Sequence, residues 1–161
     1  MSTVSGQPSE SEARRPGLGA VDAIGGKDAY LAVVTTLRPD GTAHSSLVNA
    51  GLLRHPVSGS QVAAFVTYGR IKLNHLRARP ALTLSWRAGW SWVSVDGTAE
   101  LAGPDDPLPG LDPGRLPALL RDVFTGAGGQ HSDWEAYDRV MVGQRRVAVL
   151  VTPTRSYGSA R

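Results

Sequence analysis

Apolar and polar residues alternate along much of this chain in a pattern that predicts β-strands. Six stretches are rich in β-branched and aromatic residues and are bounded by Gly, Pro, Asp or Ser, which is typical of strands. They cover residues 30–37, 43–53, 61–67, 81–86, 92–101 and 145–153. In the fifth stretch, Val93, Val95 and Gly97 share one face, as the two-residue period of a strand requires. Turn-forming residues at 38–41 predict a hairpin between the first two strands.

Two later segments have the three- and four-residue spacing of amphipathic helices. The first is expected to have Asp112 as its N-cap, Pro113 at its first position and its end at Gly126. Its apolar face consists of Leu116, Leu119, Leu120, Val123 and Phe124. The second is expected to open with a capping box of Ser132 and Glu135 and to end at Gly143. Its apolar face consists of Trp134, Tyr137, Val140 and Met141, and we interpret both faces as core.

Six strands with few, short helices favour a sheet that closes on itself. A closed antiparallel sheet leaves no bare edge for another chain to pair with. We therefore predict a mainly β fold with some α structure, built as a six-stranded antiparallel barrel with short flanking helices.

The segment after the third strand changes abruptly from apolar to basic. Gly69 permits a turn, and Arg70, Lys72, Arg77 and Arg79 follow within ten residues. Helix N-termini and fixed cations both favour an anionic ligand, so this pattern is typical of a phosphate site. A solvated surface helix whose cations add solubility explains the same pattern equally well.

Length and composition limit the classes of function. A chain of 161 residues is expected to form one domain, which we place at 21–161, after a Ser-, Gly- and Pro-rich arm over residues 1–20 that is expected to be disordered. The chain has no cysteine, and no apolar run approaches the ~20 residues of a membrane helix. The first residues show neither a basic leader nor an apolar signal core, from which we expect a cytoplasmic protein. The net charge of +3 suits an anionic ligand or a nucleic acid.

Five motifs in one order resemble a known family. They lie at residues 37–41, 69–80, 89–101, 131–134 and 145–158, and include Gly-Arg-Ile-Lys, Gly-Trp-Ser-Trp and Arg-Arg-Val. Together they resemble the B branch of the flavin/deazaflavin oxidoreductases, in the pyridoxamine 5'-phosphate oxidase-like group of the FMN-binding split β-barrel superfamily. The resemblance covers residues 21–158 and implies a six-stranded split barrel. It also implies a homodimer with coenzyme F420, or alternatively FMN, in a groove between the subunits.

The resemblance also implies which residues bind the cofactor. Arg70 and Lys72 would hold its phosphate, with Thr67, Tyr68 and Gly69 contributing donors from the turn. Trp90 would lie against the cofactor across the interface, and Arg145 and Arg146 match the paired arginines of the family. Arg77 and Arg79 are left with a surface or tail-contacting role.

Strand 43–53 is the expected wall of the site. The ring of a flavin or deazaflavin requires flat apolar walls and backbone hydrogen bonds, which Ser46, Val48 and Asn49 are expected to offer. Relatives carry bulky aromatic residues where this chain has Asn49, Ala50 and Gly51. We therefore hypothesise a substrate pocket at these three residues that accepts a bulky polycyclic natural-product intermediate.

The implied activity is transfer of a hydride from reduced F420 to a carbon–carbon double bond conjugated to a carbonyl. The protein then needs no nucleophile, because the cofactor carries the reactive atom and the protein positions it. The alternatives are an FMN-dependent oxidase and a non-catalytic flavin-, haem- or bilin-binding protein. A nucleic-acid binder is disfavoured because aromatic residues do not interleave the basic ones. The four histidines, at positions 44, 55, 75 and 131, lack metal-ligand spacing, so no metal is expected.

Overall fold

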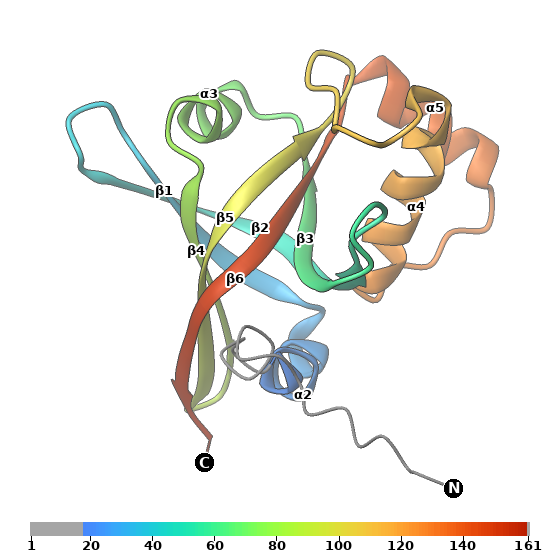
Figure 1. Ribbon diagram of the computed structural model, residues 1–161. Helices are drawn as coiled ribbons and strands as arrows, with labels where there is room; N and C mark the ends of the chain where they lie inside the picture. Colours follow the sequence, from blue (N-terminus) through green and yellow to red (C-terminus); the bar gives the residue numbers. More distant parts are fainter. Residues whose placement is uncertain (1–17, 161) are drawn as a thin grey trace, which may run out of the picture.

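The computed structural model describes residues 18–160, which fold into an antiparallel β-barrel flanked by short helices (Figure 1). The strands are β1 (Leu31–Leu37), β2 (Ala43–Arg54), β3 (Gln61–Thr67), β4 (Ala81–Ala88), β5 (Ser91–Ala102) and β6 (Val147–Ser159). They close in the order β1-β2-β3-β6-β5-β4, and β4 pairs with β1. The predicted mainly β, six-stranded antiparallel barrel is confirmed.

Four α-helices surround the barrel in the described part of the chain: α2 (Gly19–Gly25), α3 (Arg70–Ala78), α4 (Leu116–Gly126) and α5 (Trp134–Gly143). Two short 3-10 helices, η1 (Gly26–Asp28) and η2 (Pro113–Arg115), precede β1 and α4. Figure 1 shows α3 at one end of the barrel, α2 near the other, and α4 with α5 beside β2 and β3. No helix among residues 18–160 has the length and apolar character needed to cross a membrane.

Two apolar clusters hold these parts together. The first fills the barrel and includes the fully buried Phe65, Leu84 and Trp86, whose indole N–H donates to Ala50 O at 2.8 Å. The second lies between the outer face of β3 and the apolar faces of α4 and α5, as the helical spacing predicts. It contains Tyr137 and Met141, whereas Val140 is 48% exposed and does not belong to the core.

The predicted helix starts are partly right. Asp112 does act as an N-cap, since its carboxylate accepts from Gly114 N–H at 2.8 Å, although the cap opens η2, which leads directly into α4. The predicted capping box at Ser132 is wrong. Asp133 caps α5 instead and accepts from Ala136 N–H at 3.0 Å, because it lies in the extended conformation directly before the first helical residue.

The last strand differs from its prediction at both ends. Arg145 and Arg146 precede β6, which begins at Val147 and continues past Pro153 to Ser159. The strand survives the proline because Pro153 lies opposite a register shift at Asp96 and Gly97, where a ladder hydrogen bond is not required. At the N-terminus, residues 1–17 of the predicted arm lie outside the described residues, whereas Leu18 is buried and α2 begins at Gly19.

Candidate functional site

The barrel is split beside the first half of β2. Residues 43–49 of β2 pair with β1, but β3 pairs only with residues 50–54. The backbone groups of successive strand residues alternate between the two edges. Ala50 N–H donates to Tyr30 O on the β1 side, so the groups of Ser45 and Leu47 face the open edge. Two residues of β2 thus present backbone donors and acceptors beside the turn that leads into α3.

Lys72 spans this split. It projects from the first turn of α3, and its Nζ donates to Ser46 Oγ at 2.6 Å. Burial lowers the pKa of Lys72 below the usual range for lysine, because the charged amine has lost part of its hydration. An anion beside Lys72 would restore the favourable charge interaction that the lost water no longer supplies.

The start of α3 adds further donors. Its N-cap, Gly69, supplies no side chain, and the first backbone bond of the helix runs from Leu73 N–H to Gly69 O. The N–H groups of Arg70, Ile71 and Lys72 therefore have no acceptor within the helix. The Arg70 side chain makes no hydrogen bond or ion pair with any residue in the range 18–160 and is exposed to solvent. The predicted phosphate-binding residues therefore lie together with free donor capacity.

A cavity of about 620 Å³ opens next to this helix start. Tyr68, Arg70 and Arg145 contribute to its lining, with Asp105 and Gln144 from the facing loops. Arg145 pairs with Asp105 at 2.7 Å, and both side chains are more than half exposed. Hydrogen bonding and charge from Arg145 lower the pKa of Asp105 below its usual value. This exposed pair is weak enough for an anionic ligand to compete for Arg145.

Arg146 lines a cavity that its neighbour Arg145 does not reach. Its guanidinium lies 4.0 Å from the ring centre of Tyr68, and its Nε donates to Gln144 Oε1 at 2.8 Å. Arg146 and Asn49 both line a second cavity of about 250 Å³ between the outer faces of β2 and β3 and the helices α4 and α5. Tyr68 lines the larger cavity and Arg146 the smaller, so their contact lies between the two.

The other two basic residues of α3 are engaged elsewhere. Arg77 forms a bidentate pair with Asp106 at 2.9 and 2.6 Å, and Arg79 Nε donates to Leu37 O at 3.4 Å. Asp106 raises the pKa of Arg77 through this hydrogen bonding. Arg77 still lines the larger cavity, but its charge is already paired.

Three predicted residues of β2 do not face the cavities as expected. Ala50 is fully buried inside the barrel, and Val48 packs against the same core. A Cβ on Gly51 would collide with Gly126 O at the end of α4. The small residues at 50 and 51 therefore permit close packing and do not enlarge an outward pocket. Of the predicted substrate-pocket residues Asn49, Ala50 and Gly51, only Asn49 lines a cavity, and its amide also donates to Ala29 O at 2.8 Å.

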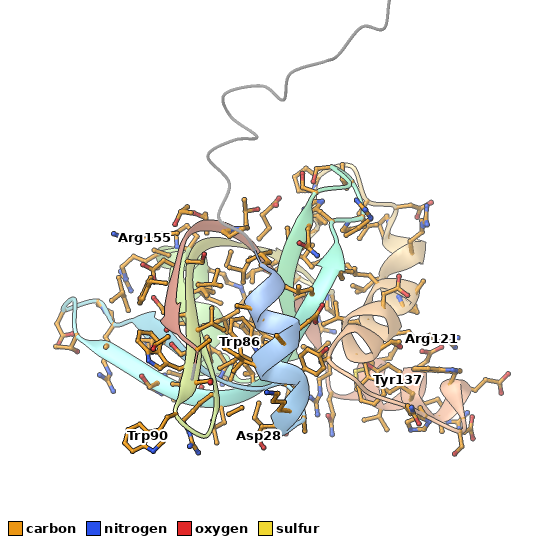
Figure 2. All side chains as sticks on the ribbon, turned by 90° about the horizontal axis from the view of Figure 1, so that it is seen from below. Asp28, Trp86, Trp90, Arg121, Tyr137 and Arg155 are labelled. Atoms are coloured by element: carbon orange, nitrogen blue, oxygen red, sulfur yellow. The ribbon has the colours of Figure 1, made fainter. Side chains whose placement is uncertain are left out.

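Trp90 lies apart from the other predicted residues. It occupies the β4–β5 turn, is 84% exposed and projects from the body of the molecule, as Figure 2 shows. A row of side chains crosses the outer sheet face from Leu47 through Val33, Ser85 and Ser94 to Tyr157. Leu47 is 68% exposed, and Val33 and Tyr157 more than 40%. Trp90 is thus available to a second molecule and not to its own groove.

The sequence assigned no role to His75, and the structure shows that its side chain is buried. The buried ring of His75 hydrogen-bonds through Nδ1 to Thr36 Oγ1 at 2.9 Å and meets His44 edge to face at 5.4 Å. Burial, His44, Arg79 and Arg38 lower the pKa of His75, in that order of importance. The apolar spacing of Leu73 and Leu76 around His75 could have indicated this inward position, but its partners come from distant strands. Within residues 18–160, no three His, Cys, Asp or Glu side chains gather into a metal site.

Comparisons with known proteins agree with this geometry. Residues 25–111 match the sequence model of the family described as pyridoxamine 5'-phosphate oxidase, which is more than half of the chain. The chain belongs to this family. Its barrel is the fold of the FMN-binding split-barrel superfamily, whose members include flavin- and F420-binding oxidoreductases.

Solved structures with the same fold are distant in sequence. A protein described as an F420 reductase is 20% identical, with a TM-score of 0.56, and the match covers 88% of this chain and 98% of that one. A conserved hypothetical protein of Mycobacterium tuberculosis is 18% identical, with a TM-score of 0.61 and coverage of 91% and 86%. An FMN-binding, pyridoxamine 5'-phosphate oxidase-related protein of Nostoc punctiforme is 15% identical, with a TM-score of 0.58 and coverage of 87% and 82%. At these identities the likeness concerns the fold.

Proposed function

We propose that this protein is an F420-dependent oxidoreductase of the B branch, which transfers a hydride to a carbon–carbon double bond conjugated to a carbonyl. The observation that carries the proposal is the breadth of the cationic surface around the start of α3. Arg70 and Arg145 line a cavity of about 620 Å³, and Lys72 projects from the same helix start toward Ser46, next to the unpaired helix N–H groups. A compact monophosphate needs only part of this surface, whereas the phosphodiester and polyglutamate tail of F420 would use its full extent.

The residues present fit such a cofactor. Arg70 has no competing partner in the described chain, Lys72 is partly desolvated, and α3 begins without a side-chain cap. Each of these features stabilises a bound anion. For the ring, the open edge of β2 offers the backbone groups of Ser45 and Leu47, and the exposed faces of Leu47 and Tyr68 offer apolar area.

Reduced F420 would supply the hydride, so this chain has to bind and orient the cofactor and the substrate and to exclude water from them. Lys72 and Arg70 would fix the phosphate end at α3, and Arg145 would extend the contact along the larger cavity. The β2 edge would then set the plane of the ring relative to the smaller cavity. Positioning of this kind accounts for a large share of the barrier reduction in such reactions. The hypothesis of a bulky polycyclic substrate is not retained, because it rested on Ala50 and Gly51, and these residues do not line either cavity.

The cofactor itself is the decisive test. The purified protein should be mixed separately with F420, FMN, haem and biliverdin and then passed through gel filtration, with the retained chromophore measured by absorbance. We expect F420 to co-elute with the protein at near one equivalent and the others to separate from it. Retention of FMN, haem or biliverdin in place of F420 would support the alternative of an FMN-dependent oxidase or a binding protein.

We also propose that the active form is a homodimer that buries the outer sheet face and brings Trp90 toward the partner's groove. The support is the exposed apolar and aromatic side chains on that face. Leu47 and Val33 are neighbours on β2 and β1, and Tyr157 lies against Trp92 beyond Ser85 and Ser94. Patches of exposed apolar side chains often mark protein–protein contacts. A second copy would cover the patch and would add an aromatic wall to the cofactor groove.

A further inference from the structure

The smaller cavity has apolar walls from three elements. Val66 comes from the outer face of β3, Val123, Phe124 and Ala127 from α4 and the residue after it, and Met141 from α5. Tyr137 adds its ring but not its hydroxyl, which already donates to Leu120 O at 3.0 Å. A cavity with such walls favours an apolar ligand.

Two polar groups with spare capacity lie at the edge of this cavity. Arg146 uses Nε for Gln144 and its π face for Tyr68, and its two terminal nitrogens have no partner in the range 18–160. Asn49 uses its amide nitrogen for Ala29 O, and its side-chain oxygen has no partner in the same range. The Tyr68 contact and the Gln144 bond hold the guanidinium in place. A held cation with free N–H groups beside apolar walls is suited to an oxygen that carries negative charge.

We infer that the smaller cavity binds the hydride acceptor, an apolar compound of one or two rings whose carbonyl or carboxylate oxygen contacts Arg146. The size of the ligand follows from the volume of about 250 Å³, which is below the ~300–1,000 Å³ of sites for drug-sized molecules. The oxygen requirement follows from the charge of Arg146. The part that this residue plays in turnover rests on the function proposed above.

The chemistry of the reaction gives Arg146 a specific task. A hydride added to the carbon β to the carbonyl breaks the carbon–carbon π bond, and that electron pair moves to place a negative charge on the carbonyl oxygen. A proton from solvent then adds to the α carbon and restores the neutral carbonyl. The negative charge exists only after hydride addition, so a cation fixed beside that oxygen stabilises the transition state more than the substrate.

Binding of an unreactive probe tests the site without cofactor. The probes are 2-naphthoate and its neutral counterpart 2-naphthylmethanol, titrated calorimetrically into the full chain. We expect 2-naphthoate to bind more tightly, and Arg146→Gln to weaken its binding about tenfold or more, as loss of a charge-assisted hydrogen bond implies. Binding of 2-naphthylmethanol should change less than about twofold, since it lacks the charge. Arg146→Lys should retain part of the preference for the carboxylate.

The methionines locate the probe within the molecule. The chain has only two, Met1 and Met141, and Met141 lines the cavity. In protein labelled with ¹³C at the methionine methyl groups, 2-naphthoate should shift the Met141 signal. Ala127→Leu, which fills part of the cavity, should abolish that shift and the binding of both probes, with circular dichroism as the check on folding.

Arg145→Gln is the matched control, because Arg145 is the adjacent arginine and lines the larger cavity but not the smaller one. It should leave the affinity for 2-naphthoate unchanged. The proposal is overturned if Arg145→Gln lowers the affinity for 2-naphthoate as much as Arg146→Gln does. It is equally overturned if the two probes bind with the same affinity, or if the Met141 signal does not shift when 2-naphthoate is added. It is also overturned if the retained cofactor displaces 2-naphthoate, since the cavity would then hold the cofactor ring.

These outcomes are distinct from failure of the proposed function. If the protein retains neither F420 nor FMN but binds 2-naphthoate through Arg146, the ligand site stands and the oxidoreductase assignment falls. If F420 is retained and 2-naphthoate is not bound, the assignment stands and this substrate site falls.

Discussion

Arg145 and Arg146 show how a single backbone conformation separates two adjacent and identical side chains. Arg145 has a φ of 50°, which is uncommon for a residue other than glycine. This conformation follows the end of α5 and precedes β6, and it turns Arg145 toward Asp105 while Arg146 covers Tyr68. The sequence shows a pair of cations. Only the backbone between two elements directs Arg145 to the larger cavity and Arg146 to the smaller one, while both still line a third cavity between α4 and α5.

Lys72 is the residue whose removal tests the anion site most directly. Lys72→Ala should weaken F420 binding by roughly 1.5–3 kcal/mol, the value of one charge-assisted contact. The fold should remain intact, because the only hydrogen-bond partner of Nζ in the described chain is Ser46. Isothermal titration with F420 measures the loss.

The control for Lys72 is the other lysine of the chain, the exposed Lys27 in η1. Lys27→Ala should leave the affinity for F420 unchanged. An unchanged affinity in Lys72→Ala, with the fold preserved, would rule out the proposed role of Lys72.

His75 predicts a pH dependence of stability. Its pKa in the folded protein lies below the ordinary 6.5, because the ring is buried and near His44, Arg79 and Arg38. As the pH falls below about 6.5, the unfolded chain therefore takes up a proton that the folded chain does not. The free energy of unfolding should be fully retained above that pH and should decrease toward pH 5.5. Urea denaturation at pH 7.5 and 5.5 measures this decrease.

His75→Asn should reduce this pH dependence, since asparagine can keep the bond to Thr36 but does not titrate. His131→Asn, at an exposed histidine whose Nδ1 accepts from Asp133 N–H, serves as the control and should leave the dependence as in the unmodified protein. An equal slope in His75→Asn and the unmodified protein would show that another group titrates.

At the scale of elements, the site depends on how closely α4 approaches β2. The backbone of Gly126, at the end of α4, occupies the space where a side chain on Gly51 would lie. The same approach brings Val123, Phe124 and Ala127 of the α4 region to Val66 of β3 and so forms the smaller cavity. The absence of a side chain at Gly51 is therefore a condition for the contact between strand and helix.

Gly51→Ala should destabilise the protein by about 1–3 kcal/mol, the usual cost of overpacking, because the added Cβ meets a backbone carbonyl that cannot rotate away. Chemical denaturation measures the change. Gly143→Ala is the control, since no atom lies within 4 Å of the added Cβ at the end of α5. If both substitutions cost the same, close packing of α4 on β2 is not the cause.

At the scale of the whole molecule, the row from Leu47 to Tyr157 on the outer sheet face carries large exposed side chains, Leu47, Val33 and Tyr157, that the described part of the chain leaves uncovered. The row crosses five strands, β2, β1, β4, β5 and β6, so it depends on the pairing of β1 with β4, which are distant in sequence. Thr83, Arg155 and Tyr157 donate to the carboxylate of Asp96 and form a polar network beside the row. Interfaces between subunits usually combine apolar side chains with polar groups at their rim.

Val33→Lys should dissociate the proposed dimer, because a charge would be buried in the interface next to Leu47. Light scattering coupled to gel filtration should show a dimer for the unmodified protein and a monomer for the variant. Val142→Lys, at a 70% exposed valine on α5, should remain dimeric. A monomer for the unmodified protein at micromolar concentration would overturn the proposed dimer.

The sequence by itself determined the elements of this protein. Alternation placed the first five strands and the start of β6 within two residues, and apolar spacing identified α4 and α5, because both signals come from local periods of the backbone. The helix α2 was missed, since its seven residues include two glycines and lack a side-chain cap. The continuation of β6 beyond Pro153 was missed because the bulge that permits it, at Thr154, is defined only by the pairing of β6 with β5.

Only the tertiary structure decided which side chains meet. The contact of Lys72 with Ser46, the separation of Arg145 from Arg146, and the inward position of Ala50 depend on strand register and on loops distant in sequence. The cavity at Arg146 has walls from β3, α4 and α5, whose juxtaposition no local pattern records. Residue types thus predicted an anion site, and the tertiary structure determined where its candidate cations and the apolar walls beside them lie.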